Sequence, residues 1–226
     1  MHIEPGIVDG AKIALSYATA AGALGFAAKK TMDDLRNSGI ASFAARSAIA
    51  TVGVFAFFEI LPHFPVGVSE VHFILGSTLF LILGAAPATF GLAMGLLIQG
   101  VFFAPIDLPQ YFINLTTLLV PLFAMQALAK KVIAPGTAYV DLKYSQALAL
   151  STAYQAGVVG WVAFWVFYGQ GIGAETMASV FTFGAAYMMV ILIEPLVDLA
   201  VLATAKSLRG LERGGLVTPR LYAAAT

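Results

Sequence analysis

The sequence predicts an all-α integral membrane protein: one domain, residues 1–226, built as a bundle of about seven transmembrane helices. Composition is the first reason, because 60% of the residues are hydrophobic and only 11% are charged, whereas roughly a quarter of the residues of a soluble domain are charged. The second reason is a series of apolar stretches, each of a length that suits a membrane crossing. The chain also has no cysteine, which excludes disulfide, iron–sulfur and thiolate metal sites.

Each membrane crossing needs an apolar stretch of roughly 20 residues. We expect crossings at about 10–28, 40–61, 72–86, 88–103, 113–128, 147–167 and 177–203. Between the third and fourth, the sequence Ala85-Ala86-Pro87-Ala88 suits a tight turn. Polar or turn-forming connections follow the first and fifth crossings. No second, soluble domain interrupts this plan.

The distribution of basic residues sets the expected orientation. Most lysines and arginines follow the first, fifth and seventh crossings, and only Lys12 is left for the other side. The positive-inside rule therefore predicts an outside N-terminus and a cytoplasmic C-terminus, in a multi-pass protein of the cell inner membrane. Residues 207–226 then form a basic cytoplasmic tail. The outer loops carry acidic residues, which raise the local concentration of cations: Glu4, Asp9, Glu70, Asp107 and Glu175.

Several function classes are excluded or disfavoured by the sequence. The formal net charge is zero, which argues against nucleic acid as a partner and leaves the lipid bilayer as the expected surrounding. The chain lacks the Gly-x4-Gly-Lys-Ser/Thr loop that holds nucleotide phosphates, so ATP hydrolysis by that route is excluded. No pairing of a nucleophile with a base is recognisable. We therefore do not expect an enzyme.

Residues 1–9 are expected to form a metal-chelating N-terminal segment. The amine of Met1 and the amide nitrogen and imidazole of His2 can close adjacent chelate rings around one ion, which leaves one in-plane position open. Ni(II) and Cu(II) favour such square nitrogen sites, and Co(II) can be forced into one. An imidazole from elsewhere in the chain would complete four nitrogens.

Two other histidines compete for the open position. His72 begins the third expected helix at its outer end, which makes it the obvious donor. His63 lies between Pro62 and Pro65, which fix an extended loop, and it is the expected bystander near the site. The alternative for either histidine is a polar residue at the membrane interface that is satisfied by water.

Several motifs resemble the CbiM/NikM family, the substrate-binding membrane components of energy-coupling-factor transporters for cobalt and nickel. They are Met1-His2-Ile3, the stretch from Pro65 to His72, Gly84, and the run Leu96-Leu97-Ile98-Gln99-Gly100-Val101-Phe102-Phe103 followed by Asn114. The resemblance covers the N-terminus and about residues 64–121, and the plan of seven crossings fits the remainder.

The resemblance implies both a site and a function. The metal ligands would be the Met1 amine, the His2 amide and imidazole, and the His72 imidazole, with Asn114 and Gln99 as polar residues near the site that orient it. An interhelical hydrogen bond is an equally good interpretation of Gln99. The chain would capture Co2+ or Ni2+ as transported ligand, without a prosthetic group, and work with a transmembrane scaffold subunit and cytoplasmic ATPase subunits.

Two departures from the family pattern keep an alternative open. The sequence Ala104-Pro105-Ile106-Asp107 replaces a His-Gly-Gly type of loop, and Gly67-Val68-Ser69-Glu70 replaces a Gly-Gly-Thr-Ser stretch. Lost glycines change how closely the backbone can approach an ion. The alternative is a non-transporting accessory subunit that keeps this fold in another membrane complex.

Two further features lie outside these motifs. Small residues repeat every four positions in the first crossing, as Ala14, Ala18 and Gly22, with Ala21 and Gly25 alongside. Such a stripe either docks a scaffold subunit or packs inside the chain. Glu194 and Asp198, one turn apart in the last crossing, could form a buried ionisable pair with a role in transport. Their position near the cytoplasmic boundary favours interface residues against Arg209 or a partner instead.

Overall fold

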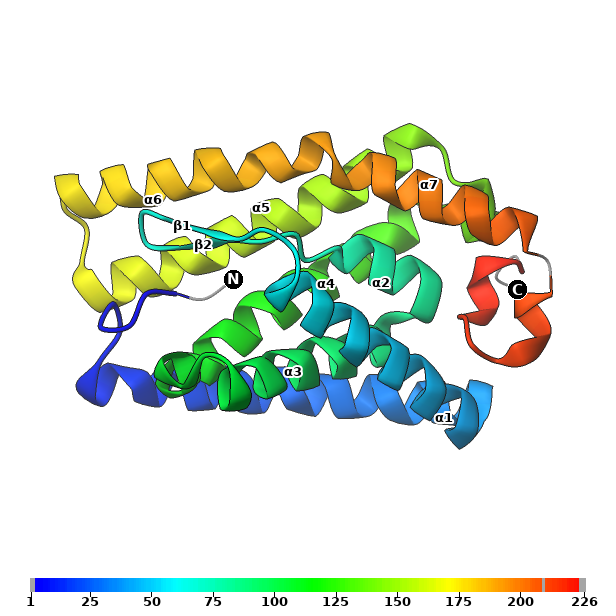
Figure 1. The fold of residues 1–226 in the computed structure, drawn as a ribbon, viewed down its shortest axis with the longest axis horizontal. Coiled ribbons are helices and arrows are strands. Elements are labelled where there is room, and N and C mark those ends of the chain that lie inside the picture. The colour runs from blue at the N-terminus through cyan, green and yellow to red at the C-terminus, as the bar shows by residue number, and fades with distance from the viewer. Residues whose placement is uncertain (1–2, 209, 224–226) are drawn as a thin grey trace.

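The computed structural model describes residues 3–208 and 210–223 of the chain. Figure 1 shows an elongated bundle in which the long helices lie side by side. A short antiparallel hairpin is formed by β1 (Phe64–Val66) and β2 (Ser69–Val71). The predicted all-α membrane class is confirmed at this level. The helices are α1 (Ala14–Glu59), α2 (Gly76–Leu83), α3 (Ala85–Phe102), α4 (Tyr111–Val132), α5 (Tyr144–Gln170), α6 (Ala174–Met188) and α7 (Glu194–Ser207).

The long helix α1 is a pair of helical arms joined at Gly39. This residue has φ 77° and ψ 164°, a conformation outside the helical region that favours glycine because no Cβ atom clashes there. Figure 1 shows the chain reversing direction at this point. The two arms correspond to the first two expected crossings. Together they form one apolar helical run, Gly10–Glu59.

The expected third crossing, His72 to Ala86, is corrected by the structure. Residues 64–71 form the hairpin, and only the eight residues of α2 are helical. At 1.5 Å per residue α2 is about 12 Å long, much less than the roughly 30 Å of a hydrocarbon core. The helix begins late because Leu75 has a left-handed φ of 53°, and it ends at Gly84, where φ is 91° and the chain turns into α3.

The expected seventh crossing is divided into two helices. A 3-10 turn, Met189–Leu192, separates α6 from α7, and Pro195 lies in the first turn of α7. Proline has no N–H for the helical ladder and clashes with the preceding turn, which accounts for the break at this point. The two helices still form one apolar run, Ala174–Ser207.

Five runs of the described residues are helical, long and apolar enough to cross a membrane. Besides the two runs above they are Ala85–Phe102, Pro105–Val132 and Tyr144–Gln170, which correspond to the expected fourth, fifth and sixth crossings. The core lies along α4 and α5, where Leu118, Tyr154 and Trp165 are fully buried. Large apolar side chains also face outward, as expected of a surface in contact with lipid.

The small residues of the first crossing lie on the outer surface of the bundle. Ala14, Ala18 and Gly22 are exposed, as are Ala21 and Gly25, whereas the inward face of this arm is formed by Ser16, Ala20, Ala23 and Ala27. Packing inside the chain, one of the two interpretations of this stripe, is therefore wrong.

Candidate metal site

The N-terminal segment is fixed against the bundle from Ile3 onward. Ile3 is 2% exposed, forms an antiparallel bridge with Ser69 of β2, and donates its N–H to Asn114 Oδ1 at 2.9 Å. The next residue, Glu4, donates its N–H to Val68 O at 3.1 Å. The chain that precedes Ile3 therefore leaves from a fixed point between the hairpin and α4. Met1 and His2 themselves lie outside the described residues.

Contacts further along the segment fix it at a second place. Val8 is fully buried, and its carbonyl accepts a hydrogen bond of 2.9 Å from the buried amide of Gln110. Lys12 donates to the carbonyl of Gly169 at the end of α5, at 2.6 Å. Contacts with the hairpin, α4 and α5 thus fix the path of the backbone through residues 3–12.

His72 lies directly after β2 and its side chain is fully buried. Its Nε2 is 2.8 Å from Glu70 Oε2, and its ring lies 5.4 Å from the ring of Phe58. A carboxylate on one ring nitrogen fixes the orientation of an imidazole and directs its other nitrogen, here Nδ1, toward a ligand. Glu70 was not among the expected site residues. Its position two residues before His72 in a strand was the available signal, because alternate residues of a strand share a face.

His63 stacks on His72. The ring centroids are 4.9 Å apart and the ring planes differ by 8°. Its Nδ1 lies 3.3 Å from Leu61 O. An imidazole holds a metal in its own ring plane, and two stacked, nearly parallel planes do not meet at one ion. In this arrangement His63 can support the His72 ring but cannot share an ion with it.

The two polar residues expected near the site differ in their contacts. Asn114 is 1% exposed and binds the main chain of Ile3 directly. Gln99 is 4% exposed on α3, and its Oε1 has no hydrogen-bond partner among residues 3–208 and 210–223. Of these two residues, Asn114 is the one that forms a hydrogen bond with the described part of the N-terminal segment.

Three partly buried carboxylates lie around this segment: Glu4, Glu70 and Asp107. Burial raises the pKa of the Glu4 carboxyl above its ordinary value of 4.5, and the charges of Glu70 and then Asp107 raise it further. Glu70 and Asp107 belong to the two stretches in which the sequence departs from the family pattern. Both departures thus add negative charge beside the N-terminal segment.

The described residues do not contain a complete cage of side chains for a metal. Within them, no group of three or more histidine, cysteine, aspartate or glutamate side chains is placed to hold one ion. A site at His72 therefore needs ligands of another kind, such as main-chain or terminal nitrogens.

Glu194 and Asp198 do not lie on the surface of the bundle, which corrects the expectation of interface residues and agrees with a buried pair. Both are fully buried on α7. Glu194 accepts hydrogen bonds from the Leu75 N–H at 3.1 Å, from Ser151 Oγ at 3.0 Å and from Gln155 Nε2, and Asp198 accepts from Thr78. The physical reason is α2, because the first turn of a helix that starts inside the bundle needs acceptors and favours negative charge. Glu194 thus caps the start of the helix that follows His72, and Asp198 binds the hydroxyl of Thr78 in its first turn.

A family model and one solved structure match the chain. The model of CbiM, described as the cobalt uptake substrate-specific transmembrane region, matches residues 2–210. A solved structure described as the crystal structure of a truncated transition metal transporter superposes with a TM-score of 0.65, covering 94% of this chain and 99% of that chain at 18% identity. At that identity the likeness shows the fold. No curated protein matches the chain.

Proposed function

Since this chain belongs to the CbiM family of cobalt-uptake transmembrane regions, whose model matches residues 2–210, we propose that it is the substrate-binding membrane component for Co2+ or Ni2+ of an energy-coupling-factor transporter. The family and the apolar helices establish a multi-pass membrane protein of metal uptake. The choice of ion, the type of transporter and the site are the proposal.

The proposed site combines the Met1 amine, the amide and imidazole of His2, and the imidazole of His72. The observation that carries it is the fixed position of Ile3, which pairs with Ser69 and is bound to Asn114. Consecutive Cα atoms are about 3.8 Å apart. In the proposal, the ligands of residues 1 and 2 are therefore within two such steps of the fixed Ile3. His72 follows Ser69 by three residues on the same hairpin.

Glu70 determines which nitrogen of His72 we assign to the metal. Because Glu70 Oε2 lies 2.8 Å from Nε2, the ligand in our proposal is Nδ1. With the ligands from residues 1 and 2 this gives four nitrogens, which suits Ni(II) in a square arrangement. The carboxylates of Glu4, Glu70 and Asp107 do not complete a cage, but their charge favours a cation at this place.

Energy for transport must come from other subunits in this proposal, because the chain has no nucleotide-binding loop. The exposed stripe of small residues on the first arm of α1 is the surface we assign to a transmembrane scaffold subunit. Small residues allow two helix backbones to approach closely. ATPase subunits would act through that scaffold.

The site is tested by two variants that change it differently. One adds an alanine between Met1 and His2, which moves the amine out of chelating register, and the other is His72→Ala. Both should abolish binding of Ni2+ and Co2+ to the purified chain, measured as bound metal per protein by mass spectrometry. His63→Ala is the matched control and should retain most of the bound metal. Unchanged stoichiometry in the inserted variant or in His72→Ala would rule out the site.

A separate experiment distinguishes transport from the accessory role. We expect ATPase subunits to co-purify with the chain from its native membrane and metal uptake by vesicles to require ATP. Stoichiometric co-purification with a different membrane complex, without ATPase subunits, would favour the accessory role instead. That outcome would leave the metal-binding test unaffected.

A further inference from the structure

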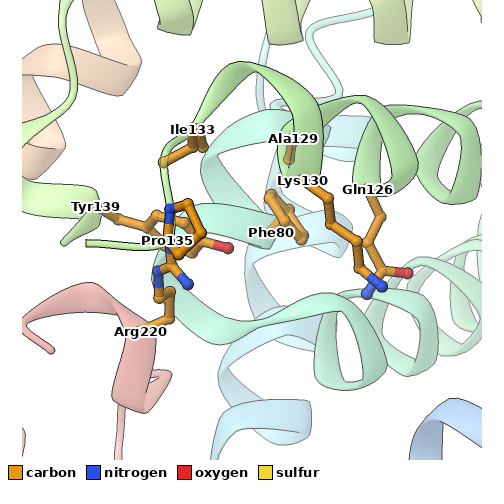
Figure 2. A pocket seen from close by; sticks show the side chains of 8 residues that line it. All are labelled: Phe80, Gln126, Ala129, Lys130, Ile133, Pro135, Tyr139 and Arg220. Atoms are coloured by element: carbon orange, nitrogen blue, oxygen red, sulfur yellow. The ribbon is translucent and has the colours of Figure 1, made fainter. Parts of the chain in front are cut away.

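A cavity of about 360 Å³ opens near the C-terminal end of α4. Figure 2 shows the side chains around it, which come from α2, the last turns of α4, the loop after α4 and the C-terminal tail. None of the residues of the N-terminal site lines it. It is a separate feature that the proposed metal function does not use.

The charged side chains on the cavity wall are all cationic. Among the residues that the structure describes, Lys130 and Arg220 line it, and no aspartate or glutamate does. An adjoining hollow shares Phe80, Gln126 and Tyr139 with the cavity and adds Lys30, Asp33 and Asp34. Asp34 is bound to the buried guanidinium of Arg46 at 2.6 Å. The cavity itself therefore presents positive charge.

Arg220 is held in place by contacts with the loop. Its Nε and Nη2 donate to the carbonyls of Thr137 and Ala134 at 3.2 and 3.0 Å, and its guanidinium lies 5.5 Å from the centre of the Tyr139 ring. Within the described residues, Nη1 makes no hydrogen bond. Burial raises the pKa of the Tyr139 phenol, while the nearby charge of Arg220 acts in the opposite direction. The charge of Arg220 is thus fixed beside a neutral aromatic wall.

The carbonyl groups at the neighbouring helix ends do not cancel this positive charge. The last carbonyls of a helix carry partial negative charge, but here donors cap them. Leu83 O accepts from Arg46 Nη1 at 2.7 Å, and Val132 O accepts from Gln146 Nε2 at 2.8 Å. An anion in the cavity would meet cations rather than uncapped carbonyls.

The rest of the wall is apolar or aromatic, with Phe80, Ile133 and Tyr139. The cavity lies where the apolar run Pro105–Val132 ends, the level at which lipid headgroups meet a membrane protein. A cationic pair beside an apolar wall at this level matches a phosphate group attached to an apolar molecule. We propose that this cavity binds a phosphate-bearing anion, and that its occupant is the headgroup of an anionic phospholipid.

Lipid retention by the full chain tests this assignment. The protein, in detergent, is mixed with equimolar phosphatidylglycerol and phosphatidylcholine, separated from unbound lipid by gel filtration, and its lipid is quantified by mass spectrometry. We expect the wild type to retain phosphatidylglycerol in preference to phosphatidylcholine. Lys130→Gln should lower retained phosphatidylglycerol about fivefold, the effect of one cationic contact. The matched control is Lys131→Gln, which removes an exposed charge from the adjacent residue outside the cavity wall.

Each outcome decides for or against the cavity. An equal loss in the Lys130 and Lys131 variants would mean that general surface charge retains the lipid, and would overturn the proposal. In a second arm, excess inorganic phosphate should leave the retained phosphatidylglycerol unchanged, because it lacks the apolar part. If inorganic phosphate removes the lipid, or if the wild type shows no preference between the two lipids, the phospholipid assignment fails. Thermal unfolding of both variants checks that the fold is kept.

Discussion

Charges of opposite sign lie around two regions of this bundle. Around the N-terminal segment, Glu4, Glu70 and Asp107 lie close enough to affect one another. At the end of α4, Lys130 and Arg220 line a cavity to which no carboxylate of the described residues contributes. The two regions differ in construction as well as in charge.

In the acidic region, the described side chains do not form a complete metal-binding set, whereas the basic region contains a cavity. No set of three metal-binding side chains converges among the described residues, and the best-fixed group near His72 is the main chain of Ile3. In the proposed site, binding at the acidic region depends on main-chain and side-chain nitrogens that are positioned through Ile3. Binding at the basic region depends on individual side chains around existing space. Single substitutions should therefore act through backbone anchors in the first region and through charges in the second.

Helix α2 connects the two regions, and removing its cap should produce the largest effect. α2 begins four residues after His72, and Phe80 within it lines the basic cavity. Glu194→Ala leaves three donors, on Leu75, Ser151 and Gln155, without their acceptor. At about 1 kcal/mol for each hydrogen bond, we expect a loss of about 3 kcal/mol in the free energy of unfolding.

The measurement is thermal or denaturant unfolding of the purified protein in detergent. Glu175→Ala, which removes an exposed carboxylate from the first turn of α6, is the control and should have little effect. If both variants unfold alike, the buried cap does not stabilise the bundle. If Glu194→Ala is destabilised, we also expect weaker binding at both regions, since α2 contributes to each.

A smaller effect, confined to the acidic region, is expected from Asn114→Ala. The variant removes the acceptor of the Ile3 N–H, so the N-terminal segment loses its bond to α4. Changes in the groups that orient metal ligands typically cost about 10- to 100-fold in affinity. We expect a loss of about tenfold in Ni2+ affinity, measured by isothermal titration calorimetry, with retained phosphatidylglycerol unchanged.

The conservative variant Asn114→Asp separates anchoring from other roles of this residue. Its carboxylate can still accept the Ile3 N–H, so affinity should stay near that of the wild type. Wild-type affinity in Asn114→Ala would show that the Ile3 anchor does not position the metal site. The contrast between the two regions would then lose its structural basis.

The sequence was sufficient for the membrane class and for most of the helices, because apolar length and charge distribution report directly on burial in lipid. It was insufficient for the third crossing. The stretch from His72 to Ala86 is as apolar as its neighbours, but the left-handed Leu75 delays the helix. The presence of a leucine at position 75 does not predict a left-handed conformation. Tertiary contacts hold this conformation, including the hydrogen bond from the Leu75 N–H to Glu194.

The site residues divide in the same way. Met1, His2 and His72 could be named from chelate chemistry and family resemblance, and they remain predictions. The stacking of His63 on His72 and the contact of Glu70 with His72 depend on how the hairpin folds. For Glu194 and Asp198 the sequence left a buried pair and interface residues open, because their position along an apolar run does not show which face of the helix is covered. Their role follows only from the internal start of α2.

The smallest effect is expected from Glu4→Gln, and it tests the sign of the charge around the N-terminal segment. The pKa of Glu4 in the folded protein lies above 4.5, so the folded state holds this proton more tightly than the unfolded state. Its carboxylate therefore lowers stability as the pH rises above 4.5. Without metal, Glu4→Gln should raise the melting temperature at neutral pH and leave it unchanged below pH 4.5, whereas Asp9→Asn, an exposed acid in the same segment, should change neither. Saturating Ni2+ should reduce or reverse the gain, because a bound cation stabilises the carboxylate. A lower melting temperature for Glu4→Gln at neutral pH without metal would show that this region already holds enough positive charge to balance its acids.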